Sequence, residues 1–192
     1  MSMTRFLDLV CPAAGTALWS EWLTGTAERS RAAADALIDE WAAAATPSGR
    51  LAQHVYLSMD GAGLLFHAQW TSDEAHLAWA RARRAGVVSR VDTLVPDIER
   101  PGLTRTRLHH SVVHDAERPA GVFVVSTRAA GDVEATGVPA PGLLAAHVHL
   151  ATDGGRAIVV TEWTDASSHE AATAGDVSFK RYTLYHSFVD DV

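Results

Sequence analysis

The stretch HVHLATDGGRAIVVTEWTDASSH, from His147 to His169, occurs twice in this chain. Its first copy, HVYLSMDGAGLLFHAQWTSDEAH, runs from His54 to His76, 93 positions earlier and without a gap. When both copies are extended back to the preceding glycine, 11 of 28 aligned positions are identical. Average composition gives only about two identical pairs by chance, so the chain contains an internal duplication. This duplication predicts two related structural units.

The composition excludes several classes of partner. The 192 residues carry a net charge of −7 and contain no basic run, which argues against nucleic acid and anionic membranes as partners. The apolar fraction of 47% is that of an ordinary globular protein. Cys11 is the single cysteine, so no intrachain disulfide is expected, and neither a signal peptide nor a membrane-spanning stretch is visible. These features predict a cytoplasmic location.

The first unit has the pattern strand, helix, strand, strand, helix, strand, which is the order of a split βαβ or ferredoxin-like unit. Asp60-Gly61 is a strong hairpin signal between its two central strands. Thr71 and Glu74 have the spacing of a capping box and open its second helix. The expected strands are 16–23, 51–59, 64–70 and 104–113, and the expected helices are 27–45 and 71–85.

The second unit repeats this order in a trimmed form. Its expected strands begin at Gly121 and span 144–150, 157–163 and 181–189, and a short helix follows Thr164. The segment 128–141 is too short and too rich in glycine and proline to form a helix like 27–45. The missing helix should leave apolar sheet surface uncovered, which predicts a homodimer. The chain divides into an N-terminal arm, 1–14, a first repeat, 15–118, and a second repeat, 119–192.

In both halves a strand ending in Trp70 or Trp163 leads into a capped helix that carries His76 or His169. This pattern resembles the antibiotic biosynthesis monooxygenase family, over nearly the whole chain. The resemblance implies an α+β fold in which two ferredoxin-like (split βαβ) repeats pack as a pseudo-dimeric α+β barrel. It also implies a cofactor-independent monooxygenase that uses molecular oxygen on an aromatic polyketide-type intermediate of secondary (antibiotic) metabolism.

The sequence departs from this family at two kinds of position. The oxygenases carry an asparagine four residues before the tryptophan, where this chain has Phe66 and Val159. Haem-degrading relatives place a ligand histidine ten residues after the tryptophan, where this chain has Ala80 and Thr173. The family also uses an arginine near the end of the second helix, and Arg90 is the matching candidate. The resemblance therefore implies neither haem nor another cofactor.

Ten histidines supply candidate proton shuttles near neutral pH. We expect a pocket between the sheet and the helices of the first half, walled by Trp70, Phe66 and helix 27–45. The candidate catalytic residues are His54, Trp70, Arg90 and His110. The candidate substrate-binding residues are Phe66, Trp41, Tyr56, His147, His149, Trp163 and His186. Each histidine also fits a structural role with satisfied hydrogen bonds, and each repeated tryptophan also fits a core anchor.

Other functions remain open on the same residues. His147 and His149 have the spacing of two metal ligands, but no third ligand can be named, so no metal site is predicted. A non-oxidative polyketide cyclase would need the same pocket and a histidine acid or base, without oxygen. A non-catalytic ligand-binding or structural barrel protein is the third alternative.

Overall fold

The structure is a computed structural model that describes residues 9–133, 136–174 and 179–190. Its strands are β1 (Thr16–Leu23), β2 (Arg50–Ser58), β3 (Gly63–Trp70), β4 (Glu99–Val113), β5 (Val122–Ala129), β6 (Leu143–Ala151), β7 (Arg156–Trp163) and β8 (Lys180–Val189). Its helical segments are α1 (Ala27–Ala43), α2 (Asp73–Trp79), η1 (Ala80–Arg84), α3 (Ala85–Leu94) and α4 (Ala166–Ala172). No helix in these ranges is long and apolar enough to cross a membrane.

The eight strands form one closed antiparallel barrel, in the order β1-β3-β2-β8-β5-β7-β6-β4. Within the first half the order is β4-β1-β3-β2, and the second half repeats it as β8-β5-β7-β6. The last strand of each half pairs with the second strand of the other half, as β2–β8 and β4–β6. The fold class predicted from the duplication and the resemblance, two ferredoxin-like repeats closed into a pseudo-dimeric barrel, is therefore confirmed.

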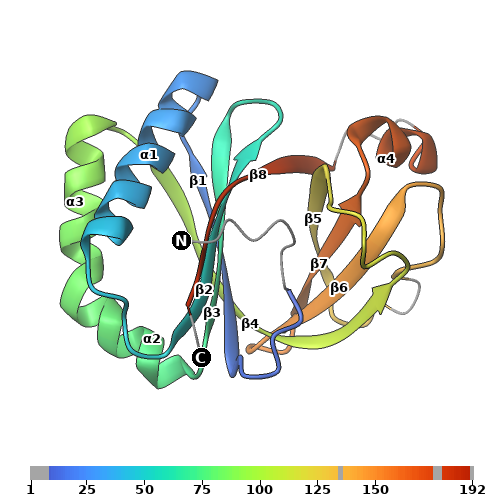
Figure 1. The fold of residues 1–192 in the computed structure, drawn as a ribbon, viewed down its shortest axis with the longest axis horizontal. Helices are drawn as coiled ribbons and strands as arrows, with labels where there is room; N and C mark the ends of the chain where they lie inside the picture. Colours follow the sequence, from blue (N-terminus) through green and yellow to red (C-terminus); the bar gives the residue numbers. More distant parts are fainter. Residues whose placement is uncertain (1–8, 134–135, 175–178, 191–192) are drawn as a thin grey trace.

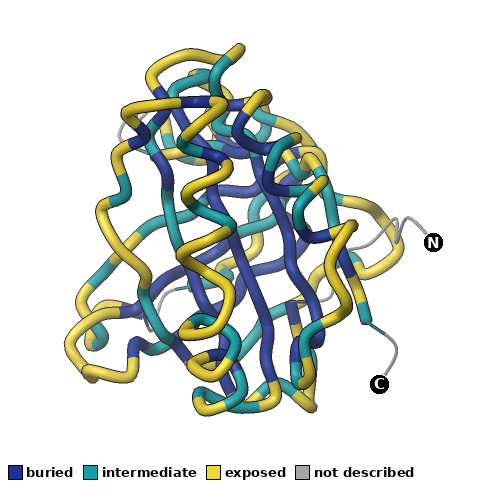
Figure 2. Tube along the Cα trace, turned by 90° about the vertical axis from the view of Figure 1, so that its left-hand side faces the viewer, coloured by how far each residue is buried: buried dark blue, intermediate teal, exposed yellow. Residues whose placement is uncertain are grey.

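Helices cover the two halves unequally (Figure 1). Helices α1 and α3 and the segment between β3 and α3 pack on the outer face of the first sheet, where Leu37, Trp41 and Val91 join Phe66 in an apolar core. Seen from this side, buried strands lie behind helices whose outer surface is exposed (Figure 2). A second apolar core, which includes Trp19, Leu65 and Ile158, fills part of the barrel interior.

The segment 128–141 changes one expectation about the second half. It contains no helix in its described part, as predicted, yet the sheet face that it crosses is not uncovered. Val133 is buried against Val148 and Val159, and Ala140 packs beside Trp163. The prediction of an uncovered apolar face is therefore wrong, because Val133 and Ala140, in the loop after β5, pack against this face. A homodimer stays a prediction that this face does not support.

Helix boundaries differ from the sequence prediction at two places. Ser72, not Thr71, caps α2 by accepting a hydrogen bond from the backbone N–H of Ala75, and the repeat-related Asp165 caps α4 in the same way. The second helix does not end near Ala85 but continues to Leu94 through the π-helical turn η1. Val91 explains this extension, because it is fully buried against the first half's helix-side core.

Two glycines at matching positions connect the strands and helices of each repeat in the same way. Gly49 and Gly142 both have a left-handed backbone, with φ of +84° and +83°. Their carbonyl oxygens accept hydrogen bonds from the N–H groups of Thr71 and Thr164, which follow the two tryptophan-ended strands. A Cβ at Gly142 would lie 2.4 Å from the Cβ of Ser168, so a side chain there would push on the N-terminal turn of α4.

We expect Gly142→Ala to destabilise the protein more than Gly154→Ala. Both positions have positive φ, +83° and +74°, which costs an L-residue about 1–2 kcal/mol. Only Gly142 adds a steric overlap, which typically costs about 1–3 kcal/mol more, since nothing lies within 4 Å of a Cβ at Gly154. Urea unfolding followed by circular dichroism measures both free energies, and equal losses would contradict the steric argument.

Candidate active site

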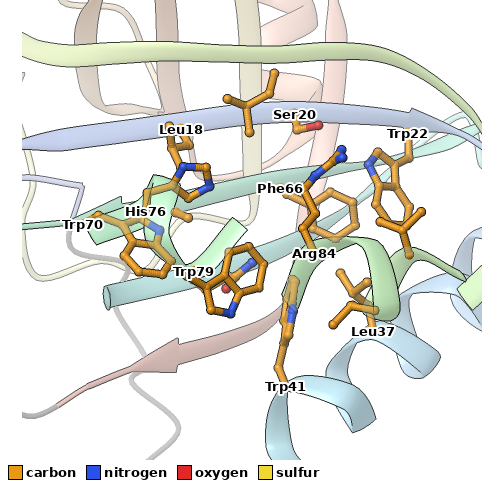
Figure 3. A pocket seen from close by; sticks show the side chains of 15 residues that line it. Leu18, Ser20, Trp22, Leu37, Trp41, Phe66, Trp70, His76, Trp79 and Arg84 are labelled. Carbon is orange, nitrogen blue, oxygen red and sulfur yellow. The ribbon is translucent and has the colours of Figure 1, made fainter. Parts of the chain in front are cut away.

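A cavity of about 80 Å³ lies between the first sheet and the helices that cover it. The strands β1, β2 and β3 supply its floor, and α1, α2, η1 and α3 supply its roof. Figure 3 shows Trp70, His76 and Trp79 at one end of the cavity and Trp22 and Phe66 at the other. The aromatic side chains that line it are Trp22, Trp41, Phe66, Trp70 and Trp79. Such walls fit a flat apolar ligand.

Four polar side chains interrupt these aromatic walls, namely Ser20, Gln53, His76 and Arg84. Ser20 is already engaged, because its hydroxyl donates to the carbonyl oxygen of Gly102. Arg84 is exposed and reaches the cavity from η1, and its charge is one of the causes that lower the pKa of His76. The cavity therefore combines an apolar body with one cation and one imidazole.

The contact between Arg105 and His76 determines which ring nitrogen of His76 carries the proton. The guanidinium of Arg105 on β4 lies 2.8 Å from its Nδ1, and because arginine only donates, this nitrogen must accept. The proton of the neutral ring then sits on Nε2, which has no hydrogen-bond partner in the described part of the chain. Burial, followed by the charges of Arg105 and Arg84, lowers the pKa of His76 to about 4. At neutral pH His76 is thus an uncharged donor and not a base.

The second half contains the same arrangement of tryptophan, histidine and arginine. The Nε of Arg181 donates to Nδ1 of His169 at 3.0 Å, and the ring of His169 stands edge-on to Trp163, as His76 does to Trp70. In the described residues of the second half, this copy has no counterpart of α1, η1 or α3 above it. The histidine therefore makes the same contacts in both halves, and in the first half it also lines an aromatic cavity.

A groove of about 480 Å³ adjoins the cavity on the outside of the helices. Trp41, Trp79 and Val87 line both spaces, so these side chains form the wall between them. Arg90 lines the groove and pairs with Glu40 across it. The groove is large enough for a small molecule, whereas the cavity alone is not, since ligand pockets measure roughly 300–1,000 Å³.

The residues predicted as one site fall into two chambers on opposite faces of the first sheet. Trp41, Phe66 and Trp70 line the helix-side cavity, as expected. Within β2 the paired residues alternate, so Gln53 faces the cavity while His54 turns into the barrel beside His67. The predicted residues that face the barrel interior are His54, Tyr56, His147 and His149. The structure therefore does not bring His54 into contact with the Trp70 cavity.

Inside the barrel, the repeated histidines make repeated contacts with serine. Nδ1 of His54 lies 2.9 Å from the Ser187 hydroxyl, and Nδ1 of His147 lies 2.8 Å from the Ser111 hydroxyl. The rings differ at Nε2, because His147 reaches Glu162 at 3.1 Å while Nε2 of His54 is buried without a partner among the described residues. No group of three or more His, Cys, Asp or Glu side chains in the described residues could hold a metal ion.

The remaining predicted residues lie elsewhere. Arg90 is an exposed groove residue, and Trp163 packs in the second half's own apolar cluster. His110 pairs with Val148 and so lies on the outer face of the barrel wall, where the β4–β6 seam passes. His186 pairs with Val55 on the first half's outer face, and its ring packs on Phe188. None of these four lines the cavity.

The sequence reading missed His76, Trp79 and Arg84 as cavity residues. His76 carried a signal, because it is identical in both repeats, and so did its partner, since Arg105 and Arg181 stand at matching positions in the last strands. Arg84 carried none. It reaches the cavity from a π-helical turn, and such turns occur frequently at functional sites.

No family model matches this chain, and no curated protein matches it. Several solved structures match it over most of its length. An anthrone oxidase-like protein has a TM-score of 0.65 at 18% identity, over 91% of this chain and 92% of that one. A provisionally named monooxygenase from Fusobacterium nucleatum gives 0.55 at 11%, covering 92% and 95%. Chlorite dismutase from Candidatus Nitrospira defluvii gives 0.53 at 11%, covering 90% and 92%. At these identities the likenesses establish the α+β barrel fold alone.

Proposed function

We propose that the protein is a cofactor-independent monooxygenase that oxidises a planar phenol- or anthrone-type intermediate of aromatic polyketide metabolism. The observation that carries this proposal is the aromatic cavity beside Trp70, into which a neutral imidazole donor and an arginine also reach. The likeness to an anthrone oxidase-like protein and the sequence resemblance to the antibiotic biosynthesis monooxygenases both support it. A molecule of this class is flat and largely apolar and ionises to a phenolate or enolate, which fits both kinds of lining.

The substrate would enter from the outer groove. Arg83 and Arg90 line the groove and attract a phenolate, and displacement of Trp41 and Trp79 would join the groove to the cavity. Of these two, Trp79 is the more weakly anchored, because it directly precedes η1, which contains no buried residue, whereas Trp41 is buried in α1. Local opening at such a turn costs little free energy compared with opening of the core.

The side chains that line the cavity are better suited to stabilise an oxyanion than to act as a general base. In the proposed reaction, water in the groove takes the substrate proton, and Arg84 with the Nε2–H of His76 stabilises the resulting enolate or phenolate. The electron-rich ring carbon then reacts with molecular oxygen. A ring methylene and one O₂ give a ring carbonyl and one water, so one oxygen atom enters the product and the other leaves as water.

The rival functions differ in their use of oxygen. A polyketide cyclase would convert its substrate in this cavity without consuming O₂, and a ligand-binding protein would release it unchanged. The lack of an unengaged base among the cavity's polar side chains favours the binding protein over the cyclase. Oxygen uptake with 1,8-dihydroxyanthrone, paired with chromatography of the product, separates all three functions.

We expect Arg84→Gln to lower kcat/KM for 1,8-dihydroxyanthrone about tenfold or more, because it removes the one cation that faces the cavity. Arg81→Gln is the matched control. Both arginines are exposed and belong to η1, but only Arg84 lines the cavity. An oxygen electrode gives both rates. If the two variants behave alike, Arg84 acts only through the protein's overall charge and its proposed role fails.

A further inference from the structure

The two ends of the barrel interior differ. Toward one end the N-terminal arm enters, since Leu9 is buried in the interior core and its carbonyl oxygen accepts a hydrogen bond from Gln69 at the end of β3. Toward the opposite end lies a cavity of about 700 Å³, lined by the start of β8, the end of β5 and the facing part of β1. The mouths of β-barrels are common places for small-molecule sites, and this volume lies in their usual range. We call this space the barrel well.

The side chains of the barrel well are apolar at depth and charged at the mouth. Trp19, Leu65 and Ile158 belong to the buried interior core and form its floor. At the mouth, Lys180 binds both carboxylate oxygens of Glu21 at 2.7 and 2.9 Å, and the Tyr182 hydroxyl donates to the same carboxylate. These contacts satisfy Glu21, the one carboxylate among the described residues that line the well.

The cations at the mouth exceed this carboxylate. Arg156 starts β7 opposite Ala129, and both its side chain and that of Lys180 are more than half exposed. Arg156 is held only by Asp153 at 3.3 Å, a surface pair that contributes little. Three basic side chains line the well, Arg128, Arg156 and Lys180, so a ligand with one negative charge can approach them without displacing the Glu21 network.

We infer that the barrel well is a second binding site, separate from the helix-side cavity, for a small aromatic carboxylate. The aromatic body would rest on Trp19, Leu65 and Ile158, and the carboxylate would lie at the mouth near Lys180 and Arg156. This inference does not depend on the proposed oxygenase activity, because the floor and mouth residues of the well do not line the helix-side cavity, although both spaces touch Ser20 and Leu103.

The test uses 2-naphthoate and its neutral analogue 2-naphthylmethanol, with binding measured by calorimetry on the full chain. Thr127 faces the well opposite Ile158 and is exposed, so Thr127→Trp fills the mouth without disturbing the core. Thr127→Trp should weaken binding of both probes at least tenfold. Lys180→Met should weaken binding of 2-naphthoate about tenfold and of the neutral analogue much less.

Two controls separate this site from the others. Arg118→Met removes an exposed cation outside the well and should leave both affinities within about twofold. Ala68→Trp fills the helix-side cavity and should leave naphthoate binding in the well intact. The inference is overturned if 2-naphthoate does not bind at millimolar concentration, if Thr127→Trp leaves binding unchanged, or if only Ala68→Trp abolishes it.

Discussion

Lowering the pH from 7 to 5 should reduce the free energy of unfolding by about 4 kcal/mol or more. Burial lowers the pKa of His54 and of His149 to about 3 each, and it lowers the pKa of His67 well below its usual value, with help from the neighbouring histidines. In the unfolded chain these imidazole rings are exposed to water and have their ordinary pKa of 6.5. Below that pH the unfolded chain therefore binds protons at these rings, whereas the folded protein keeps them neutral. Their stabilising effect is complete above pH 6.5 and is lost as the pH falls toward 3.

The magnitude follows from the pKa values of His54 and His149. A histidine whose pKa drops from 6.5 to about 3 on folding costs roughly 2 kcal/mol at pH 5, and two such residues cost roughly twice that. His67 adds to the loss. Urea unfolding at several pH values gives the free energy, and its slope against pH gives the number of protons taken up. Near pH 5 the slope should approach four protons, because His76, whose pKa is lowered to about 4, adds to the three barrel histidines.

The repeat supplies the matched variant for this prediction. Val160 occupies the position in the second half that His67 occupies in the first, so His67→Val places a side chain that this fold already accepts at the matching site. It should remove about one proton from the slope. His109→Gln removes an exposed histidine and is the control. An equal free energy of unfolding at pH 7 and pH 5 would contradict burial of these rings.

The duplication predicted the fold because residues that are identical in the two repeats have the same conformation and contacts in both halves. Gly49 and Gly142 share a left-handed backbone, and Trp70 and Trp163 each meet a histidine edge-on. Such residues fix the positions of strands and helices relative to one another. The order of strands and helices could therefore be predicted from the sequence, and the closure into one barrel from the family resemblance.

The site was harder to predict because the first sheet is buried on both faces. Every residue of β3 is buried, so alternation separates Phe66 from His67 but does not say which one faces the barrel. Both faces also carry tryptophans and histidines, which removes the usual contrast between an apolar and a polar face. Assigning His54 to the Trp70 cavity was a choice that the pattern alone could not decide. The π-helical turn that brings Arg84 into place has no sequence period that would predict it.

His76→Phe should lower kcat for 1,8-dihydroxyanthrone about a hundredfold if the proposed function holds, whereas His169→Phe should leave it unchanged. Removal of one hydrogen-bond donor from a developing oxyanion typically costs about 10²- to 10³-fold in kcat. The two histidines are matched in structure, because each accepts from an arginine and stands edge-on to a tryptophan. Both variants should therefore lose similar stability, about 1–3 kcal/mol, through the unsatisfied arginine.

Arg105 should act on the reaction only by positioning His76. In the native protein, ¹⁵N chemical shifts of the His76 ring should report a single neutral tautomer with the proton on Nε2, since Arg105 occupies Nδ1 at 2.8 Å. Arg105→Met should yield a mixture of tautomers and raise the pKa of His76 above about 4, because one of the charges that lower it is gone. Turnover should fall by less than in His76→Phe, because the donor remains for part of the time. A single unchanged tautomer in Arg105→Met would show that the protein orients this ring by another contact, and full turnover in His76→Phe would remove the imidazole from the reaction altogether.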